Sequence, residues 1–363
     1  MGGFGTWRHV AIAGLAVAVS ATTASAQWTI VDDKDGDTTV KIGFLAQPQA
    51  EFVETTDDAS WSQNLFLRRV RVLLGGTLGK HWSFFFETDS PNIGKAGTAG
   101  AKEAGDVYVQ DVFVTYSHGD AFKMDVGMLL LGLSHNHLES AAALLPVDYG
   151  PYTFTESGPT GERVGRDYGL QARGYPFARR LEYRVGLFQG VRGPDSRNPL
   201  RVVARAVWHP LGSDTGYFYT GTSQGTRRAL AIGATIDRQK DYHVYGVDGF
   251  YDQPLAGGGH GLTLQAGWTH FDGAQAIRPL AEQNTWLVEA GYHFGAPRLT
   301  PFVQWAARDF TDATTPGHHN LQVGLAWWLK GHQRNLKISA GRERIEGRPA
   351  RAQVLAQLQV FYY

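Results

Sequence analysis

The chain has 363 residues, with 34 basic and 34 acidic side chains, no cysteine and 12% aromatic residues. The formal net charge of zero argues against nucleic acid or an anionic lipid surface as a partner, and without cysteine the fold cannot depend on disulfide bonds. By length alone the chain could form two soluble domains or one large barrel.

Residues 1–26 have the features of a secretory signal peptide. Arg8 begins a short positive region, residues 10–19 form an apolar run, and residues 24–26 (Ala-Ser-Ala) make a small-x-small cleavage site. The run is too short to span a bilayer as a retained helix, and the alternative is a buried N-terminal helix. No apolar run long enough for a transmembrane helix follows. We therefore expect an exported chain whose residues 27–363 form one domain, either soluble or a β-barrel in an outer membrane.

Residues 65–89 show the pattern that the rest of the chain repeats. In the first arm, Arg69 and Arg71 alternate with apolar residues, and in the second arm aromatic residues alternate with polar and acidic ones. Phe85 is an exception, because it stands at a polar position. Successive side chains of a strand point to opposite faces, so each arm has one apolar and one charged face. Such a hairpin could belong to a soluble sandwich. Repeated around a closed circle, it forms the wall of a membrane barrel, with lipid outside and water inside.

About sixteen segments along the chain show this alternation. The predicted strands are residues 38–47, 65–77, 82–89, 107–117, 121–132, 167–176, 181–191, 200–209, 227–237, 241–252, 261–272, 284–294, 300–310, 319–330, 335–346 and 351–362. A tilted membrane strand needs roughly 9–11 residues, and bacterial single-chain barrels have an even number of strands. The predicted fold class is therefore all-β: a transmembrane antiparallel β-barrel of about 16 strands.

The connections between these strands are mostly short after even-numbered strands and long after odd-numbered ones. Outer-membrane barrels show this asymmetry, with tight periplasmic turns and longer outer loops. Residues 210–226 break it as a long turn, and only residues 238–241 join the ninth and tenth predicted strands. Either the strand register is wrong there or one strand is unread.

The longest connection runs from Ser134 to Arg166 and is the third outer loop. It contains a short helical stretch that ends at Pro146, followed by a polar segment. Loops of this length are usually functional or disordered.

Basic side chains on the polar faces are the candidate solute contacts. Rings of Arg or Lys select anions, and the planar guanidinium suits phosphate and carboxylate. Acids such as Glu87 and Glu182 share these faces, so structural pairing explains any single arginine at least as well. Arg201 and Arg205 favour a functional role, because they lie on one strand face with no acid between them. The candidate pore-lining residues are Arg69, Arg71, Lys123, Arg173, Arg184, Arg201, Arg205 and Arg308.

Two stretches carry a resemblance to a known family. An Arg-Arg-x-Arg strand at residues 68–71 precedes a Gly-Lys turn and an aromatic strand that ends in acids, and residues 216–228 read GYFYTGTSQGTRR. These stretches are similar to the phosphate-selective porin O and P family of outer-membrane channels. The resemblance implies passive diffusion of small anions such as phosphate, a homotrimer surrounded by outer-membrane lipid, and a Gram-negative source. The family's phosphate path also uses lysines, whereas this chain has 25 Arg and only 9 Lys.

In families that this chain resembles, the third loop folds into the lumen and narrows it. By that analogy, Arg163 and Arg166 are constriction candidates, together with Ser134, His135 and His137.

Other functions have weaker support. The sequence contains no GxSxG, P-loop or HExxH motif, so we expect neither an enzyme nor a cofactor. His135-x-His137 and His318-His319 lack the cysteine or carboxylate that would complete a metal site, and solvated loop histidines explain them better. Two alternatives stay open: a general or organic-solute channel whose arginines are neutralised by acids, and a secreted soluble β-protein.

Overall fold

The computed structural model describes residues 28–33, 37–55, 60–255 and 257–363. The expected signal peptide, residues 1–26, lies outside the described residues. Within those ranges, no helix is long and apolar enough to cross a membrane.

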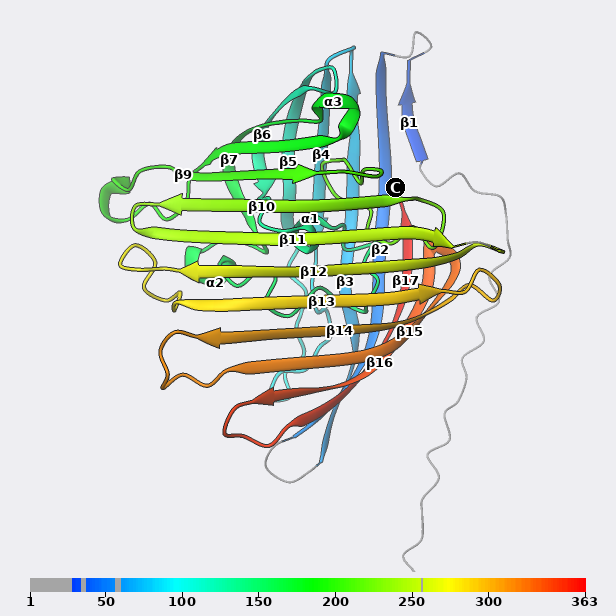
Figure 1. The fold of residues 1–363 in the computed structure, drawn as a ribbon, viewed down its shortest axis with the longest axis vertical. Coiled ribbons are helices and arrows are strands. Elements are labelled where there is room, and N and C mark those ends of the chain that lie inside the picture. Colours follow the sequence, from blue (N-terminus) through cyan, green and yellow to red (C-terminus); the bar gives the residue numbers. More distant parts are fainter. Residues whose placement is uncertain (1–27, 34–36, 56–59, 256) are drawn as a thin grey trace, which may run out of the picture.

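Strands make up most of the described chain (Figure 1). The strands are β1 (Trp28–Asp32), β2 (Thr38–Glu54), β3 (Trp61–Leu78), β4 (Trp82–Asp89), β5 (Tyr108–His118), β6 (Phe122–Leu130), β7 (Arg166–Gly174), β8 (Leu181–Phe188), β9 (Arg201–Trp208), β10 (Ala229–Gln239), β11 (Tyr242–Leu255), β12 (His260–Asp272), β13 (Gln283–His293), β14 (Leu299–Phe310), β15 (His318–His332), β16 (Arg334–Ile345) and β17 (Arg351–Tyr362). Short helical turns lie in the connections: α1 (His135–Leu138), α2 (Ser157–Thr160), α3 (Pro176–Arg179) and η1 (Pro194–Ser196).

The sheet closes into a barrel of sixteen strands. Each strand from β2 to β16 pairs antiparallel with the next one in sequence, and β17 pairs back with β2. The closing pair runs from Tyr362 opposite Phe44 to Gln353 opposite Val53. A closed sheet has no edge with unsatisfied backbone groups, as a membrane-spanning sheet requires. The predicted all-β antiparallel barrel is confirmed.

β1 is a strand that the sequence pattern did not predict. It pairs with the first residues of β2, from Trp28 opposite Ile42 to Asp32 opposite Thr39. β17 pairs with β2 only from Phe44 onward. β1 therefore continues the wall beside β2 at the point where β17 ends.

The largest difference in strand bounds lies in the β2–β3 hairpin. The sequence predicts strands over 38–47 and 65–77, whereas β2 and β3 have 17 and 18 residues. The pairing shifts its register between Ala46 and Pro48. Such a bulge lets a strand continue past a proline, which cannot donate a ladder hydrogen bond.

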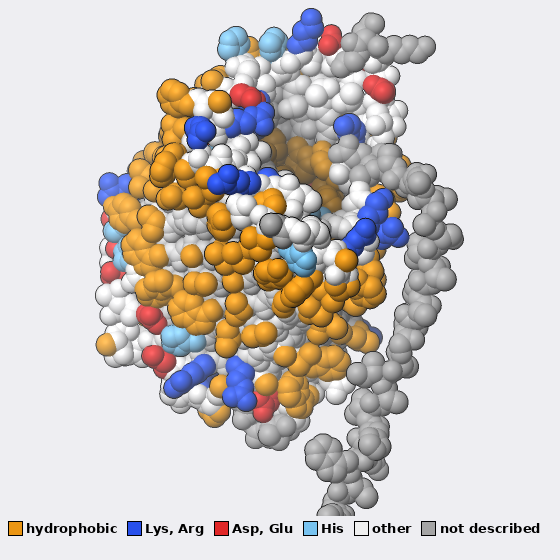
Figure 2. Space-filling view, turned by 45° about the vertical axis from the view of Figure 1, so that its right-hand side comes forward, with side chains coloured by type: hydrophobic (Ala, Val, Ile, Leu, Met, Phe, Trp, Pro, Cys, Tyr) orange, Lys and Arg blue, Asp and Glu red, His pale blue; other side chains and the backbone are white. Residues whose placement is uncertain are grey.

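The two faces of the wall differ as the alternation predicts. In β15, the side chains of Leu321, Val323 and Leu325 point outward and are 43–56% exposed. Gln322 and Ala326, at alternate positions of the same strand, point inward and are at most 4% exposed. Figure 2 shows hydrophobic side chains spread over the outer wall, with charged side chains gathered toward its ends. This outer surface suits contact with lipid hydrocarbon.

The connections define two ends of the barrel. We call the end that carries the connections after β3, β5, β7, β9, β11, β13 and β15 the turn end, and the other end the loop end. Most turn-end connections are short, as predicted, but residues 209–228 between β9 and β10 are long.

The suggested register error or unread strand near residues 210–226 is wrong. β9 and β10 pair directly, with Trp208 opposite Ile232, and β10 and β11 are joined by the two residues Lys240 and Asp241. Residues 209–228 instead fold inward from the turn end. The ring of Tyr217 stacks on that of Phe113, on the inner face of β5, with centroids 4.0 Å apart.

Candidate functional site

Most of the predicted basic residues lie inside the barrel beside carboxylates. Seven of the ten candidates form ion pairs, and their basic side chains are nearly buried. The paired carboxylates are those of Asp148 with Arg69 (2.6 Å), Glu87 with Arg71 (2.5 Å), Asp111 with Arg166 (3.1 Å), Asp125 with Arg173 (2.6 Å), Glu182 with Arg184 (2.7 Å), Asp237 with Arg201 (2.5 Å) and Asp248 with Arg205 (2.6 Å). Arg201 also contacts Glu162.

Four of these cations form one row across neighbouring strands, which we call the basic row. Lys123 of β6 is opposite Arg173 of β7, Arg173 is opposite Arg184 of β8, and Arg184 is opposite Arg205 of β9. Like charges directly opposite each other destabilise a sheet. The carboxylates at the three arginines offset this repulsion, so the row depends on its acids.

Three candidates lie apart from carboxylates. Among the described residues, no carboxylate comes within ion-pair distance of Arg163, Arg308 or Lys123. Arg163 is exposed, and its guanidinium lies 3.5 Å from the ring centroid of Tyr108. Arg308 donates to Nδ1 of His318 at 3.1 Å. Lys123 of β6 donates to the hydroxyl of Ser117 on the neighbouring strand β5 at 3.3 Å.

The third loop, predicted over 134–166, spans residues 131–165 in the structure and contacts inward-facing side chains of several strands. On one side, His135 Nδ1 lies 2.5 Å from Gln265 Oε1 of β12. On the other side, Lys337 of β16 donates to the carbonyls of Leu144 and Pro146. Asp148 accepts from Arg68 and Arg69 of β3. These contacts place the segment between opposite walls of the barrel.

Of the constriction candidates at the start of this loop, His135 and His137 are buried and Ser134 is partly buried. The hydroxyl of Ser134 accepts from the backbone N–H of His137 and caps α1. His137 Nε2 lies 3.0 Å from a carboxylate oxygen of Glu156, and both side chains are fully buried. His135 Nε2 lies 3.6 Å from Asp214. These groups fix the loop rather than face an open channel.

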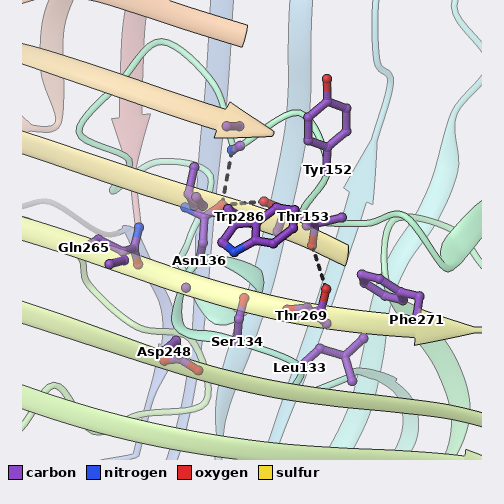
Figure 3. A pocket seen from close by; sticks show the side chains of 16 residues that line it. Leu133, Ser134, Asn136, Tyr152, Thr153, Asp248, Gln265, Thr269, Phe271 and Trp286 are labelled. Atoms are coloured by element: carbon purple, nitrogen blue, oxygen red, sulfur yellow. Dashed lines mark hydrogen bonds between the residues drawn. The ribbon is translucent and has the colours of Figure 1, made fainter. Parts of the chain in front are cut away.

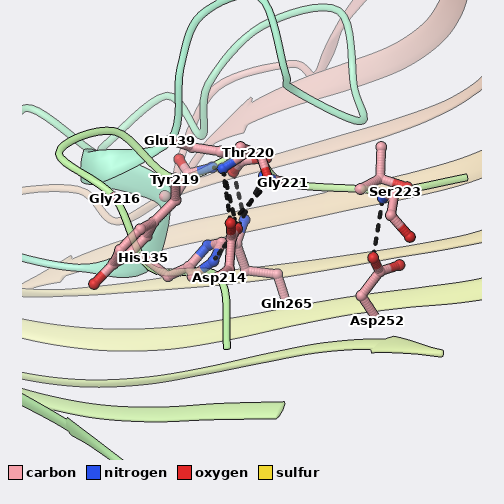
Figure 4. Close-up of polar contacts among 12 residues, drawn as sticks. His135, Glu139, Asp214, Gly216, Tyr219, Thr220, Gly221, Ser223, Asp252 and Gln265 are labelled. Carbon is pink, nitrogen blue, oxygen red and sulfur yellow. Dashed lines mark hydrogen bonds and ion pairs between the residues drawn. The ribbon is translucent and has the colours of Figure 1, made fainter. Parts of the chain in front are cut away.

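Residues 209–228 meet this loop inside the barrel, where Asp214 lies beside His135 (Figure 4). The N–H of Tyr219 donates to the carbonyl of Leu138 at 2.8 Å, and the N–H of Ser140 donates to the carbonyl of Tyr219 at 3.0 Å. The hydroxyl of Tyr219 donates to Glu182 at 2.9 Å. Arg184 donates to the carbonyl of Gly216 at 2.6 Å. Two segments from opposite ends of the barrel are thus joined to each other and to the basic row.

A small group of buried acids lies at this junction. Burial raises the pKa of the Glu139 carboxyl well above its ordinary value, and Glu289 and Asp214 nearby raise it further. The amides of Asn136 and Gln265 donate to Glu139. Burial acts to raise the pKa of Asp214 as well, but the neighbouring His135 and Arg227 hold it at about 2. Glu139 is therefore protonated over a wider pH range than Asp214.

Cavities lie on both sides of the joined segments. A cavity of about 390 Å³ at the loop end is lined by Arg69, Asp148, Gln322 and their neighbours. A cavity of about 560 Å³ lies at the turn end, where Figure 2 shows a hollow lined by hydrophobic side chains. A third cavity, of about 40 Å³, lies between the loop and β11–β14 beside Asn136 and Gln265 (Figure 3), with room for little more than a water molecule.

Sequence reasoning missed several residues of this interior. Lys337 stands at an inward position of the predicted strand 335–346, so the alternation was a signal that could have found it. Asp148 and Asp214 lie in connections, where no periodicity indicates the direction of a side chain.

Comparisons with known proteins support the fold. No family model matches the sequence, and no curated protein matches it. Among solved structures, an anion-selective porin from Comamonas acidovorans is 11% identical (90% of this chain and 100% of that chain, TM-score 0.57). Salmonella typhi OmpF in complex with daunomycin is 14% identical (92% and 100%, TM-score 0.61). The trimer form of OmpT, an outer membrane protein of Vibrio cholerae, is 10% identical (90% and 100%, TM-score 0.53). At these identities the likeness shows a shared porin-type barrel.

Proposed function

We propose that the chain is an outer-membrane channel for passive diffusion of small organic solutes, with little preference between anions and cations. The observation that carries this proposal is the pairing of the inward arginines. Seven of the ten candidate cations lie beside carboxylates, and a neutralised arginine attracts anions weakly. The outward apolar rows and the porin-type barrel support a membrane location in a Gram-negative outer membrane.

The interior also suits organic solutes. The cavities of about 390 and 560 Å³ on either side of the joined segments lie in the size range of small-molecule sites. One porin of this fold, OmpF, is known in complex with daunomycin, an organic compound. This supports the capacity of such a barrel to hold a solute of that kind.

A second candidate is a channel for small anions such as phosphate, as the resemblance to the phosphate-selective porin O and P family implies. Lys123 and Arg308, which lie apart from carboxylates among the described residues, favour this function. The anion selectivity named for the Comamonas acidovorans porin adds to it.

Assembly as a homotrimer after removal of residues 1–26 is a further part of the proposal. β4, β8 and β9 have eight residues each, whereas β11, β12 and β15 have 13 to 15. A membrane strand needs roughly 9–11 residues, so the wall with short strands is better covered by protein than by lipid. The trimer form of OmpT is consistent with this arrangement.

Reversal potentials in planar bilayers test the proposal. Under a KCl gradient we expect current steps with a reversal potential close to zero. A strongly anion-selective potential, together with block of the chloride current by phosphate, would establish the second candidate instead. Absence of current steps, with the protein recovered from the aqueous fraction without detergent, would overturn both and indicate a secreted soluble protein.

A further inference from the structure

The cavity at the turn end is lined mainly by aromatic side chains. They come from separate parts of the chain: β4, β5, the inward segment 209–228 and the C-terminus. The aromatic lining includes Phe85, Phe113, Tyr217, Phe218, Phe361 and Tyr363. We call these six residues the aromatic cluster.

The rings of the aromatic cluster touch one another around the cavity. The centroid of Phe85 lies 5.6 Å from each of the centroids of Phe113, Phe218 and Tyr363. Phe85 and Phe113 are buried, whereas Tyr217, Phe218 and Tyr363 are only partly buried. The buried rings therefore hold the partly buried rings in place, and the partly buried rings keep some of their surface toward the cavity.

The aromatic cluster departs from the pattern of the inner wall, where inward positions of the strands mostly carry polar side chains. Phe85 occupies an inward position on β4, between Ser83 and Glu87, where the alternation calls for a polar side chain. Tyr363 enters the cavity beside Gly43 and Gly75, and a Cβ atom on either glycine would collide with it. Apolar rings facing water are unfavourable, so a cluster of them in a watery lumen calls for a role.

The charge at the cavity is already satisfied. Arg173 is the one cation among the described residues that line it. Its guanidinium donates to Asp125 at 2.6 Å and to the hydroxyl of Tyr175 at 2.8 Å. The remaining polar lining includes the hydroxyl groups of Ser140 and Thr220. The cavity therefore presents aromatic faces and hydroxyl groups, and the arginine that lines it is paired with a carboxylate.

We propose that the aromatic cluster binds the ring of a neutral, hydroxyl-bearing aromatic solute as it passes through the turn end. Offset or edge-on ring contacts supply the attraction, and the cavity volume of about 560 Å³ suits a molecule of one or two rings. The inference rests on the proposed channel function and narrows its solute class. An aromatic cluster that only anchors residues 209–228 to the wall is the alternative, and it predicts no solute binding.

The test compares two neutral solutes in planar bilayers that contain the protein purified from outer membranes. Phenyl β-glucoside carries an aromatic ring, and methyl β-glucoside does not. We expect phenyl β-glucoside to interrupt the ionic current in a saturable manner and methyl β-glucoside to have little effect. Phe218→Ala should weaken the interruption about tenfold, the effect of losing one ring contact. Phe218→Tyr should retain it.

Tyr152→Ala is the matched control, because this ring lies in residues 131–165 beside the 40 Å³ cavity and away from the aromatic cluster. It should leave the interruption unchanged. Equal interruption by both glucosides, or a Phe218→Ala channel that behaves like the wild type, would overturn the inference while leaving the channel function intact.

If the protein gives no current, the channel function fails, and saturation-transfer NMR on the protein in nanodiscs then decides the binding question. The inference predicts transfer to the phenyl protons that falls in Phe218→Ala. No transfer above that of empty nanodiscs would refute it.

Discussion

Replacing Arg205 with alanine separates a structural arginine from a solute-binding one. The guanidinium of Arg205 contacts both oxygens of Asp248, at 2.6 and 2.7 Å, and donates to the hydroxyl of Thr235 at 3.0 Å. Both charged groups are nearly buried. Without Arg205, the one donor left to the Asp248 carboxylate among the described residues is the backbone N–H of His135, at 3.2 Å. Removing one partner of a buried ion pair costs about 3–5 kcal/mol of unfolding free energy.

Urea unfolding of the reconstituted barrel measures this cost. We expect Arg205→Ala to lower the free energy of unfolding by about 3–5 kcal/mol. Arg205→Ala/Asp248→Ala should lose less than the two single variants together, since the double variant leaves no charge alone. Arg163→Ala is the control, because Arg163 is exposed and has a ring contact rather than a carboxylate partner. Its cost should stay within about 0.5 kcal/mol.

Reversal potentials of the same variants measure how each substitution changes ion selectivity. Arg205→Ala leaves a negative charge inside the barrel and should shift selectivity toward cations, whereas Asp248→Asn leaves Arg205 alone and should shift it toward anions. A structural role for Arg205 is refuted if Arg205→Ala lowers the free energy of unfolding by less than about 1 kcal/mol, as for an exposed pair, and still shifts the reversal potential. That result would indicate that Arg205 acts on the passing ions rather than on the fold.

Two further variants test the loop inside the barrel. The folded-state pKa of Glu139 is raised, so the folded protein binds this proton more tightly and the free energy of unfolding falls as pH rises above about 4.5. Glu139→Gln should therefore raise the urea midpoint at pH 8 but not at pH 4, and an equal change at both values would contradict the burial argument. Asp148→Asn removes the negative charge that pairs with Arg68 and Arg69. It should raise single-channel conductance by releasing the loop and favour anions, and an unchanged conductance would show that this tether does not narrow the channel.

The strands could be predicted because their signal is local. An alternation of period two is visible within one segment, and the bounds of β12 and β17 follow from it almost to the residue. β1 has only five residues, all exposed, and it carries no alternation that would single it out. β1 pairs with the first residues of β2, which β17 does not reach. This position exists only once the barrel has closed, so the local sequence does not reveal it.

The candidate site was predictable in composition but not in its pairings. The sequence favours a functional role for Arg201 and Arg205, because no acid lies between them on β9. Their partners, Asp237 and Asp248, stand on β10 and β11, and register between strands decides which acid each arginine meets. The inward course of residues 209–228 was equally hidden, since a connection has no periodicity to reveal its direction.

The central claim is that alternate residues of each strand face lipid and a watery interior. Because the chain has no native cysteine, spin labels on single cysteines in β15 test it directly. Labels at Leu321 and Val323 should collide with oxygen dissolved in the bilayer, and labels at Asn320 and Gln322, which line the loop-end cavity, with a water-soluble nickel complex. Equal access of all four labels to the nickel complex, or labels at Leu321 and Val323 shielded from oxygen, would contradict the account.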